Sequence, residues 1–373
     1  MLKSFPNLDN FIFILFKLGQ GGFGVFAKIF YMKVDYIKFQ IFKSVYQAHR
    51  LEVGVVAAKV VNNDDFQAGE WDTAGILNND PDQVSPFFVR SILYRKFEYY
   101  TVILMEFANL GSVQNLVEQR KTLPIPIVRT IMLQILNGIQ YIHSKGIIHK
   151  DIKPSNILMH SPPGCGRVIL KITDFGEAVI KQDNLNPPYV NVAGTDVYMP
   201  PEEIFAFGTG QFFADEKIDV WSAGIVFYQI LTHTFPFKST KIEDIKEFMS
   251  RQILERPDSI DNDILWNLID RMLTFNPYFR VSANDALQHP FFTNEQATTE
   301  ITDEQNELAL KAQEAYQNGD LNVTQYETYP MFVFPLTEVQ KIVGNVDPVQ
   351  EDRDTKRIIS EFQKSNEVKF DKN

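Results

Sequence analysis

The chain has 373 residues, 45% of them hydrophobic, which is enough for a large folded core and exceeds one average domain. Its formal net charge of −11 argues against a nucleic-acid-binding surface and against a membrane partner. The single cysteine, Cys165, excludes an intramolecular disulfide and fits a reducing compartment, so we expect a cytoplasmic protein, with the nucleus as the alternative.

The first predicted element is a strand over residues 11–16, too short to span a membrane, that leads into a glycine-rich run. Backbone N–H groups without side chains can close over phosphate groups, although glycines also mark ordinary hairpins. A further strand is predicted over residues 56–59, where Lys59 can reach the same phosphates as a point charge. The run consists of Gly19, Gln20, Gly21, Gly22, Phe23 and Gly24.

A helix is predicted to begin near Phe66, because Asp64 and Asp65 can cap it. Glu70 then lies one turn into the helix and is our candidate for the ion-pair partner of Lys59, with Glu52 and nearby aspartates as alternatives. The next apolar strand covers residues 100–107 and ends in a polar turn.

Helical apolar spacing predicts a long helix over residues 127–145, and a chemically rich segment follows it. Residues 149–156 read HKDIKPSN, and residues 174–176, eighteen positions after Asn156, read DFG. The two segments supply two carboxylates, an ammonium and an amide. Phosphoryl transfer from Mg-ATP needs that set: a base for the attacking hydroxyl, a cation near the phosphate, and oxygen ligands for the metal.

With both segments in this order, the chain resembles the eukaryotic protein kinases, whose catalytic loop H-R-D-x-K-x-x-N precedes D-F-G. The resemblance covers about residues 8–292 and implies an α+β, bilobal kinase fold. A small, mainly β N-lobe with one key helix would span about residues 8–107, and a larger, mainly α C-lobe about residues 108–292. Further matches are VAAK at 56–59, Gly194 with Thr195, PPE at 200–202, DVWSAG at 219–224 and Arg280.

The resemblance implies a role for each matching residue. Asp151 would accept the proton of the substrate hydroxyl, Lys153 would steady the γ-phosphate, and Asn156 and Asp174 would hold Mg²⁺. Asp219 would brace the catalytic loop. The remaining ATP-binding candidates are the glycine-rich run with Val45, Ala57, Lys59, Glu70, Met105, Glu106, Ala108 and Leu158, and Glu202 would form a buried ion pair with Arg280.

Lys153 followed by Pro154 is the form found in Ser/Thr kinases, so the resemblance implies a protein substrate with a Ser or Thr acceptor. Within the family, the local sequence resembles the kinases that act on other kinases in MAP-kinase cascades. The alternative is a pseudokinase or scaffold that keeps the fold and signals by binding.

One departure from the family pattern is Lys150, which replaces the usual arginine of the catalytic loop. An ammonium is a poorer clamp for a phosphate than a guanidinium. Residues 177–194 contain no Ser or Thr, and Tyr189 is their only hydroxyl. We therefore expect activity that needs no Ser/Thr phosphorylation in this stretch.

Residues 25–43 are an atypical insertion between Gly24 and Lys59. Removing them joins Gly24 to Ser44 and restores the family's glycine-loop pattern, with Val45 as the residue that packs on adenine. The insertion has six aromatic residues and neither Gly, Pro, Ser nor Asn, although a tolerated insertion should be a polar loop. Either it is an unspliced intron in the gene model or it is a genuine β-hairpin extension.

Residues 293–373 form an acidic C-terminal tail with sixteen acidic and eight basic residues. We expect the tail to be partly helical, over residues 302–317 and 350–364, or partly disordered. The apolar cluster at residues 329–335 is not needed in a disordered tail, so it is predicted to dock on the kinase domain or on a regulatory partner.

Overall fold

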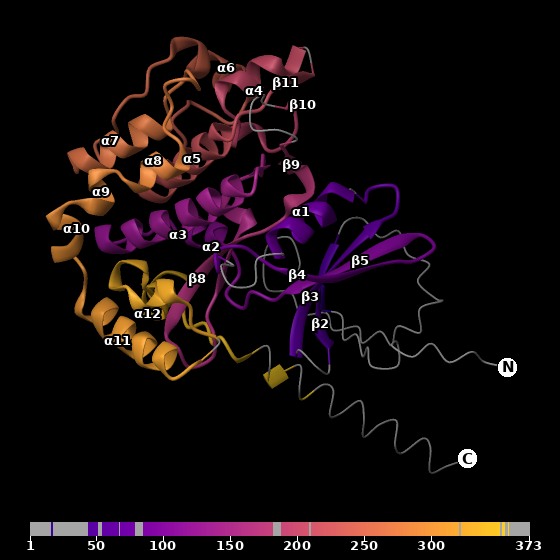
Figure 1. The fold of residues 1–373 in the computed structure, drawn as a ribbon. Helices are drawn as coiled ribbons and strands as arrows, with labels where there is room; N and C mark the ends of the chain where they lie inside the picture. The colour runs from indigo at the N-terminus through magenta and orange to yellow at the C-terminus, as the bar shows by residue number, and fades with distance from the viewer. Residues whose placement is uncertain are drawn as a thin grey trace. The chain divides into compact units, whose positions relative to one another are not determined.

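The computed structural model describes residues 16–17, 44–50, 54–66, 68–78, 85–181, 188–208, 210–320, 322–350, 353, 354 and 357 (Figure 1). The chain divides into two compact units. The first consists of residues 1–71, 89–109 and 347–373, and the second of residues 72–88 and 110–346. The glycine-rich run 19–24 and the insertion 25–43 lie outside the described residues.

The first unit contains an antiparallel sheet of five strands in the order β1-β2-β3-β5-β4. Because side chains alternate across a strand, Ala58 and Val60 share a buried face of β3 while Lys59 points to the other face. The helix α1 (Ala68–Asn78) follows β3 and begins two residues later than predicted. The strands are β1 (Phe16–Lys17), β2 (Ser44–Arg50), β3 (Gly54–Asn62), β4 (Ser91–Lys96) and β5 (Tyr100–Glu106).

The second unit is mainly helical, as predicted, and is organised around α3 (Ile125–Ser144). This helix is long and apolar enough to cross a membrane, but most of it is buried as the core helix of the unit. The other α-helices among the described residues of this unit are α2 (Val113–Glu118), α4 (Pro201–Ile204), α5 (Lys217–Thr232), α6 (Ile242–Arg251), α7 (Asp263–Met272), α8 (Ala283–Leu287), α9 (Pro290–Thr293), α10 (Glu295–Thr299), α11 (Asp303–Gln317) and α12 (Leu336–Val343).

The second unit also contains short strands between its helices and loops. They are β6 (Ile147–Ile148), β7 (Ile157–His160), β8 (Arg167–Ile172), β9 (Val179–Ile180), β10 (Tyr189–Asn191), β11 (Gln211–Phe213) and β12 (Phe334–Pro335). Three small sheets result: β6 with β9, β10 with β11, and β12-β8-β7.

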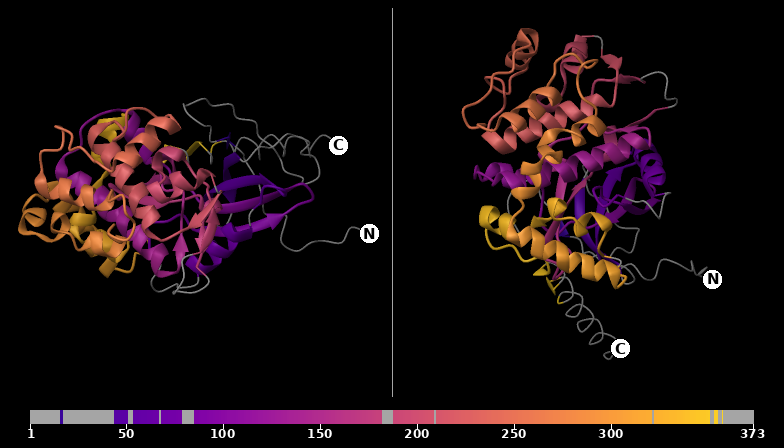
Figure 2. Two further views of the ribbon diagram at one scale, coloured as in Figure 1. Left: turned by 90° about the horizontal axis from the view of Figure 1, so that it is seen from above. Right: turned by 60° about the vertical axis from the view of Figure 1, so that its left-hand side comes forward.

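The units depart from the predicted lobe boundaries in two places. Residues 72–88 group with the second unit, because Leu77 and Phe88 are buried in the same apolar cluster as α3. Residues 293–346, expected to be a separate tail, also belong to the second unit. In Figures 1 and 2, α11 and α12 lie on the opposite side of α3 from α5 and α8.

The apolar cluster of the tail docks on the second unit, as predicted. β12 pairs antiparallel with β8, with Phe334 opposite Val168, and Phe334 is fully buried. The helix predicted over residues 302–317 is confirmed as α11, whose N-cap Thr302 accepts a hydrogen bond from the N–H of Gln305. Most of the second predicted helix, residues 350–364, lies outside the described residues.

The predicted buried ion pair between Glu202 and Arg280 is present, and it is bidentate. Arg280 Nη1 and Nη2 donate to the two carboxylate oxygens of Glu202 at 2.7 and 2.9 Å. The Arg280 side chain is completely buried, its Nε donates to the carbonyl of Thr274, and its guanidinium lies 5.0 Å from the ring centroid of Trp221. This arginine therefore joins three segments of the helical unit.

Arg280→Met is expected to lower the free energy of unfolding by roughly 3–5 kcal/mol, because it leaves Glu202 without its partner and several carbonyls without a donor. Urea denaturation measures the loss. The matched control is Arg251→Met, whose pair with Glu255 is exposed and should contribute at most about 0.5 kcal/mol. Equal urea midpoints for the two variants would contradict the structural role of Arg280.

Candidate active site

The loop at residues 149–156 is fixed by one buried carboxylate, Asp219 of α5. Its two oxygens accept hydrogen bonds from the N–H groups of His149 and Lys150, both at 2.8 Å. The ring of His143 contacts the same carboxylate at 2.8 Å. Burial by itself would raise the pKa of Asp219, but the His143 hydrogen bond and the nearby histidine charges lower it below its ordinary value. The bracing role predicted for Asp219 is therefore present in the structure.

Within this loop, Asp151 is the centre of a network of four polar side chains. Lys153 Nζ lies 2.7 Å from Asp151 Oδ2, and Asn156 Nδ2 donates to the same oxygen at 2.9 Å. The hydroxyl of Thr195 donates to Asp151 Oδ1 at 3.1 Å and accepts from Lys153 Nζ at 2.8 Å. The network holds the Asp151 carboxylate in one orientation with a cation beside it.

A backbone hydrogen bond between their two loops brings Asp174 next to Asn156. The N–H of Thr173 donates to the carbonyl of Asn156 at 2.9 Å. Asp174 adopts a left-handed backbone conformation (φ 65°, ψ 71°), which few non-glycine residues adopt. Phe175 then packs against the ring of His149, with centroids 4.9 Å apart. The two oxygen-bearing side chains therefore come from adjacent loops, as a shared metal ion would need.

The first unit forms the predicted ion pair between Lys59 of β3 and Glu70 of α1. Both side chains are largely buried, so removing either partner would leave an uncompensated buried charge. Val45 lies opposite Lys59 in the sheet, and Ala57 lies opposite Met105. The remaining described candidates are Glu106 at the end of β5, Ala108 in the loop that follows, and Leu158 in β7 of the second unit.

Lys150 does not point into solvent. It is buried, has a left-handed backbone (φ 67°), and its Nζ donates to the backbone carbonyl of Asn191 in β10 at 2.8 Å. Gly194 then passes so close to the catalytic loop that an added Cβ would lie 2.9 Å from the carbonyl of Lys150. Only glycine fits there, because φ is also +125°.

Glu203 is a site residue that the sequence reasoning missed. It is buried next to Lys150, and its Oε1 accepts a hydrogen bond from the N–H of Ala193 at 3.2 Å. Burial raises the pKa of Glu203 to about 8; the Ala193 N–H and the charge of Lys150 oppose the shift, while Glu202 and Asp219 add to it. In the sequence, Glu203 could have been noticed because it directly follows Glu202, the glutamate assigned to Arg280.

Glu203→Gln is expected to remove a pH dependence of stability. The folded-state pKa of about 8 lies above the ordinary 4.5, so the stabilisation from proton binding is complete below about pH 4.5 and is lost as pH rises through 8. Between pH 6.5 and 8.5 the thermal unfolding temperature should therefore fall further for the parent chain than for the variant. Glu247→Gln, at an exposed position, is the control. Parallel pH curves for all three proteins would contradict this assignment.

Comparison with known proteins gives one family match and several relatives. Residues 41–292, about two thirds of the chain, match the family model described as "Protein kinase domain". The match begins after the glycine-rich run and after nearly all of the insertion. The chain is 32% identical over 193 residues to the "Probable serine/threonine-protein kinase CCRP1" of Zea mays, covering 52% of this chain and 29% of that protein.

Two further relatives are animal proteins. The identity to "Serine/threonine-protein kinase par-4" of Caenorhabditis briggsae is 32% over 189 residues, covering 49% of this chain and 28% of the relative. The identity to "Serine/threonine-protein kinase ULK1" of Homo sapiens is 28% over 285 residues, covering 73% of this chain and 26% of the relative. The chain thus spans less than a third of the length of these relatives.

Proposed function

The chain belongs to the protein kinase family, and we propose that it transfers the γ-phosphoryl group of ATP to Ser or Thr hydroxyls of proteins. The observation that carries this proposal is the network of Asp151, Lys153, Asn156 and Thr195, held by Asp219. The relatives, which are named as serine/threonine kinases, support the same acceptor class. The MAP-kinase-cascade subgroup stays a prediction.

In the proposed reaction the acceptor hydroxyl oxygen attacks the γ-phosphorus while the bond to the bridging oxygen of ADP breaks. The hydroxyl proton passes to the Asp151 carboxylate, which the hydrogen bond from Asn156 holds in orientation. Lys153 Nζ, 2.7 Å from the same carboxylate, supplies a positive charge beside the transferred group. The Thr195 hydroxyl keeps Lys153 and Asp151 together.

The donor set of Asn156 and Asp174 fits Mg²⁺. Both Nδ2 hydrogen bonds of Asn156 go to Asp151, to its carbonyl and its Oδ2, so the amide oxygen is the atom that can serve as a ligand. Asp174 adds a carboxylate, and hard oxygen ligands are those that Mg²⁺ prefers. When bound, the ion would neutralise phosphate charge as it develops.

Lys59 is proposed to bind the nonreacting phosphates of ATP. The Glu70 carboxylate fixes the direction of its ammonium, since a buried lysine needs a partner to stay charged. The glycine-rich run 19–24 and Val45 are proposed to complete the nucleotide site. The polar network around Asp151 gives no support to the pseudokinase alternative.

Phosphoamino-acid analysis tests the acceptor class directly. A mixed protein acceptor is incubated with the chain and Mg-ATP, and the phosphorylated residues are identified by mass spectrometry. We expect phosphoserine and phosphothreonine above the level found with an Asp174→Asn variant. Phosphotyrosine alone would overturn the acceptor assignment but keep the kinase, whereas the absence of any transfer by a folded, ATP-binding protein would overturn the proposed function.

A further inference from the structure

Residues 191–195, which we call the anchored segment, run from the end of β10 to Thr195. Both ends of the segment are tied to the catalytic loop. At one end Lys150 Nζ donates to the carbonyl of Asn191 at 2.8 Å, and at the other end the Thr195 hydroxyl donates to Asp151 at 3.1 Å. The place of the Thr195 hydroxyl in the Asp151 network therefore depends on how the residues before it are held.

Glu203 of α4 holds the middle of the anchored segment. Its Oε1 accepts a hydrogen bond from the N–H of Ala193 at 3.2 Å. The next residue, Gly194, approaches the catalytic loop so closely that there is no room for a Cβ. One side chain from α4 and one close backbone contact thus fix the chain directly before Thr195.

The Glu203 carboxyl faces charged side chains from several elements. Lys150 comes from the catalytic loop, and Asp219 comes from α5. Glu202, the preceding residue of α4, is paired with Arg280. The anchored segment itself carries no titratable side chain. Burial raises the pKa of Glu203 to about 8, so the carboxyl is mostly protonated at pH 7 and can still accept through its carbonyl oxygen.

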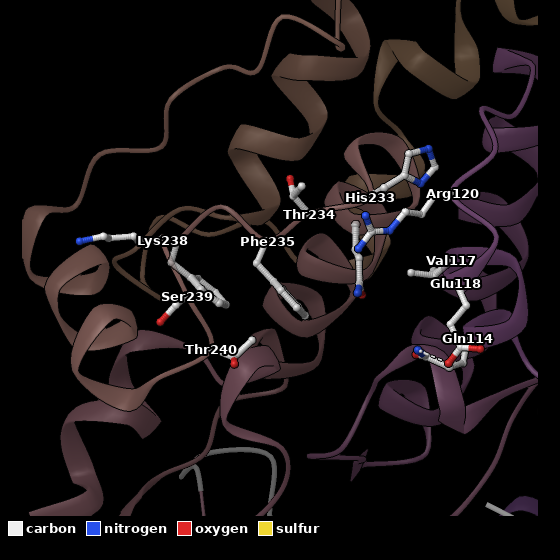
Figure 3. Close-up of a pocket in the computed structure, with 12 residues that line it drawn as sticks. Gln114, Val117, Glu118, Arg120, His233, Thr234, Phe235, Lys238, Ser239 and Thr240 are labelled. Atoms are coloured by element: carbon white, nitrogen blue, oxygen red, sulfur yellow. Dashed lines mark hydrogen bonds between the residues drawn. The ribbon is translucent and has the colours of Figure 1, made fainter. Parts of the chain in front are cut away.

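The Glu203 carboxyl lies apart from the cavity shown in Figure 3. That cavity, of about 410 Å³, is formed by α2, the end of α5 and the loop that leads to α6, and its described lining includes neither Glu203 nor Lys150. Because the Glu203 side chain is buried, its ionised form would lack water as a partner in the anchored arrangement. Ionisation therefore favours an arrangement in which the segment has moved away and water reaches the carboxylate.

We propose that Glu203 is a positioning residue for phosphoryl transfer, whose carboxyl holds the anchored segment so that Thr195 keeps Asp151 and Lys153 in place. This proposal deepens the proposed kinase function and rests on it. The stabilisation of the anchored arrangement is complete below about pH 4.5, where the carboxyl is protonated even when it is exposed, and is lost as the pH rises through 8. Transfer should therefore slow in alkaline solution.

The pH profile of kcat tests the proposal, measured on the full chain well below its unfolding temperature. Between pH 7 and 9 the kcat of the parent chain should fall about three- to tenfold, because the ratio of anchored to released segment changes about tenfold across a pKa of about 8. In Glu203→Gln the amide oxygen accepts from Ala193 at every pH, so kcat should change less than about twofold over the same range. The KM for ATP should stay within about twofold in both proteins, because the nucleotide contacts are assigned to other residues.

Two further variants complete the comparison. Glu247→Gln, at an exposed position, is the matched control and should keep the profile of the parent chain. Glu203→Leu removes the acceptor and should be slower than Glu203→Gln at every pH. If the Leu variant does not fold, the parent chain and the Gln variant still decide the question. A flat profile for the parent chain, or an equally steep fall for Glu203→Gln, would overturn the inference while the kinase function stands.

Hydrogen exchange of the anchored segment separates the two proposals. After correction for the intrinsic pH dependence of exchange, the Ala193 amide should lose protection between pH 7 and 9 in the parent chain but not in Glu203→Gln. Peptides from α3 should keep their protection in both proteins, which excludes global unfolding. If the parent chain transfers no phosphate, the proposed function fails, and this measurement alone decides whether Glu203 holds the segment. The same loss of protection in both proteins would overturn that role.

Discussion

Asp151→Asn is expected to slow phosphoryl transfer by about 10²–10⁴-fold, the usual contribution of a positioned general base. The amide has nearly the same shape as the carboxylate, so its oxygen can still accept from Lys153 and Asn156 while its NH2 group donates to the Thr195 hydroxyl. The amide cannot take up the proton of the acceptor hydroxyl, and it no longer balances the charge of Lys153. Single-turnover transfer to a Ser/Thr acceptor measures the loss.

The matched control for this substitution is Asp258→Asn, an exposed aspartate in the loop after α6. It removes the same charge without touching the catalytic loop, so its transfer rate should equal that of the parent chain. ATP affinity of the Asp151→Asn protein should stay within about threefold, because the nucleotide contacts are assigned to other residues. A rate within tenfold of the parent would remove Asp151 from the role of base.

A chain that ends at residue 292, the last residue of the family match, is expected to fail to fold as a soluble monomer. Residues 293–346 belong to the second unit, where β12 covers the edge of β8. Without β12, β8 becomes an open edge strand, and unpaired edges invite aggregation.

Side-chain contacts show how closely this tail is built into the unit. The backbone carbonyls of Met331 and Phe332 accept hydrogen bonds from Thr130 and Gln134 of α3, both at 2.8 Å. The next carbonyl, that of Val333, accepts from Gln305 within the tail at 3.0 Å. Arg167 of β8 pairs with Glu327, and both side chains are buried. Loss of that partner alone is expected to cost roughly 3–5 kcal/mol, within a total stability of about 5–15 kcal/mol.

The tail also supports the segment that follows α1. The ring of Phe87 packs against Tyr326 and Phe332 of the tail, with centroids 4.9 and 6.1 Å apart. The carbonyl of Phe87 accepts a hydrogen bond from Ile172, two residues before Asp174, at 2.9 Å. Removing the tail should therefore disturb the end of β8, which leads to Asp174, as well as the core.

Soluble yield and thermal unfolding of the shortened chain measure the effect. The control is a chain that ends at residue 350, which keeps every tail contact named above and should unfold within a few degrees of the full chain. A soluble chain of residues 1–292 with an unchanged unfolding temperature would show that the tail contacts contribute little. Val333, Phe334 and Pro335 of the apolar cluster are buried in the unit itself, so docking within the chain accounts for this half of the cluster, whereas Tyr329 is exposed.

The parts of the site that could be predicted from sequence depend on local spacing or on short signature segments. Glu70 was found as the first glutamate inside a capped helix, and Asp219 and Arg280 were placed by the segments around them. Each of these predicted contacts is confirmed. Asp219 and Arg280 were recognisable from their signature segments, whereas the choice of Glu70 over Glu52 and the nearby aspartates depended on the predicted helix.

The contacts that could not be predicted join positions far apart in the chain. Nothing in the local sequence pairs Arg167 with Glu327 or directs β12 to the edge of β8, since the sequence separation gives no periodic signal. The burial of Glu203 beside Lys150 likewise follows from packing around the catalytic loop. The family match ends at residue 292, and the local sequence gives no sign of how much of the following tail packs into the second unit.

The most direct test of the kinase assignment is Mg-ATP-dependent transfer to a Ser/Thr protein acceptor, measured for the full chain and for a chain without residues 25–43. An Asp174→Asn version of each protein is the blank. We expect the shortened chain to transfer phosphate above the blank. Transfer by the full chain as well would make the insertion a tolerated extension. If both proteins bind ATP and stay folded but transfer no phosphate, the kinase assignment is contradicted and a binding role takes its place.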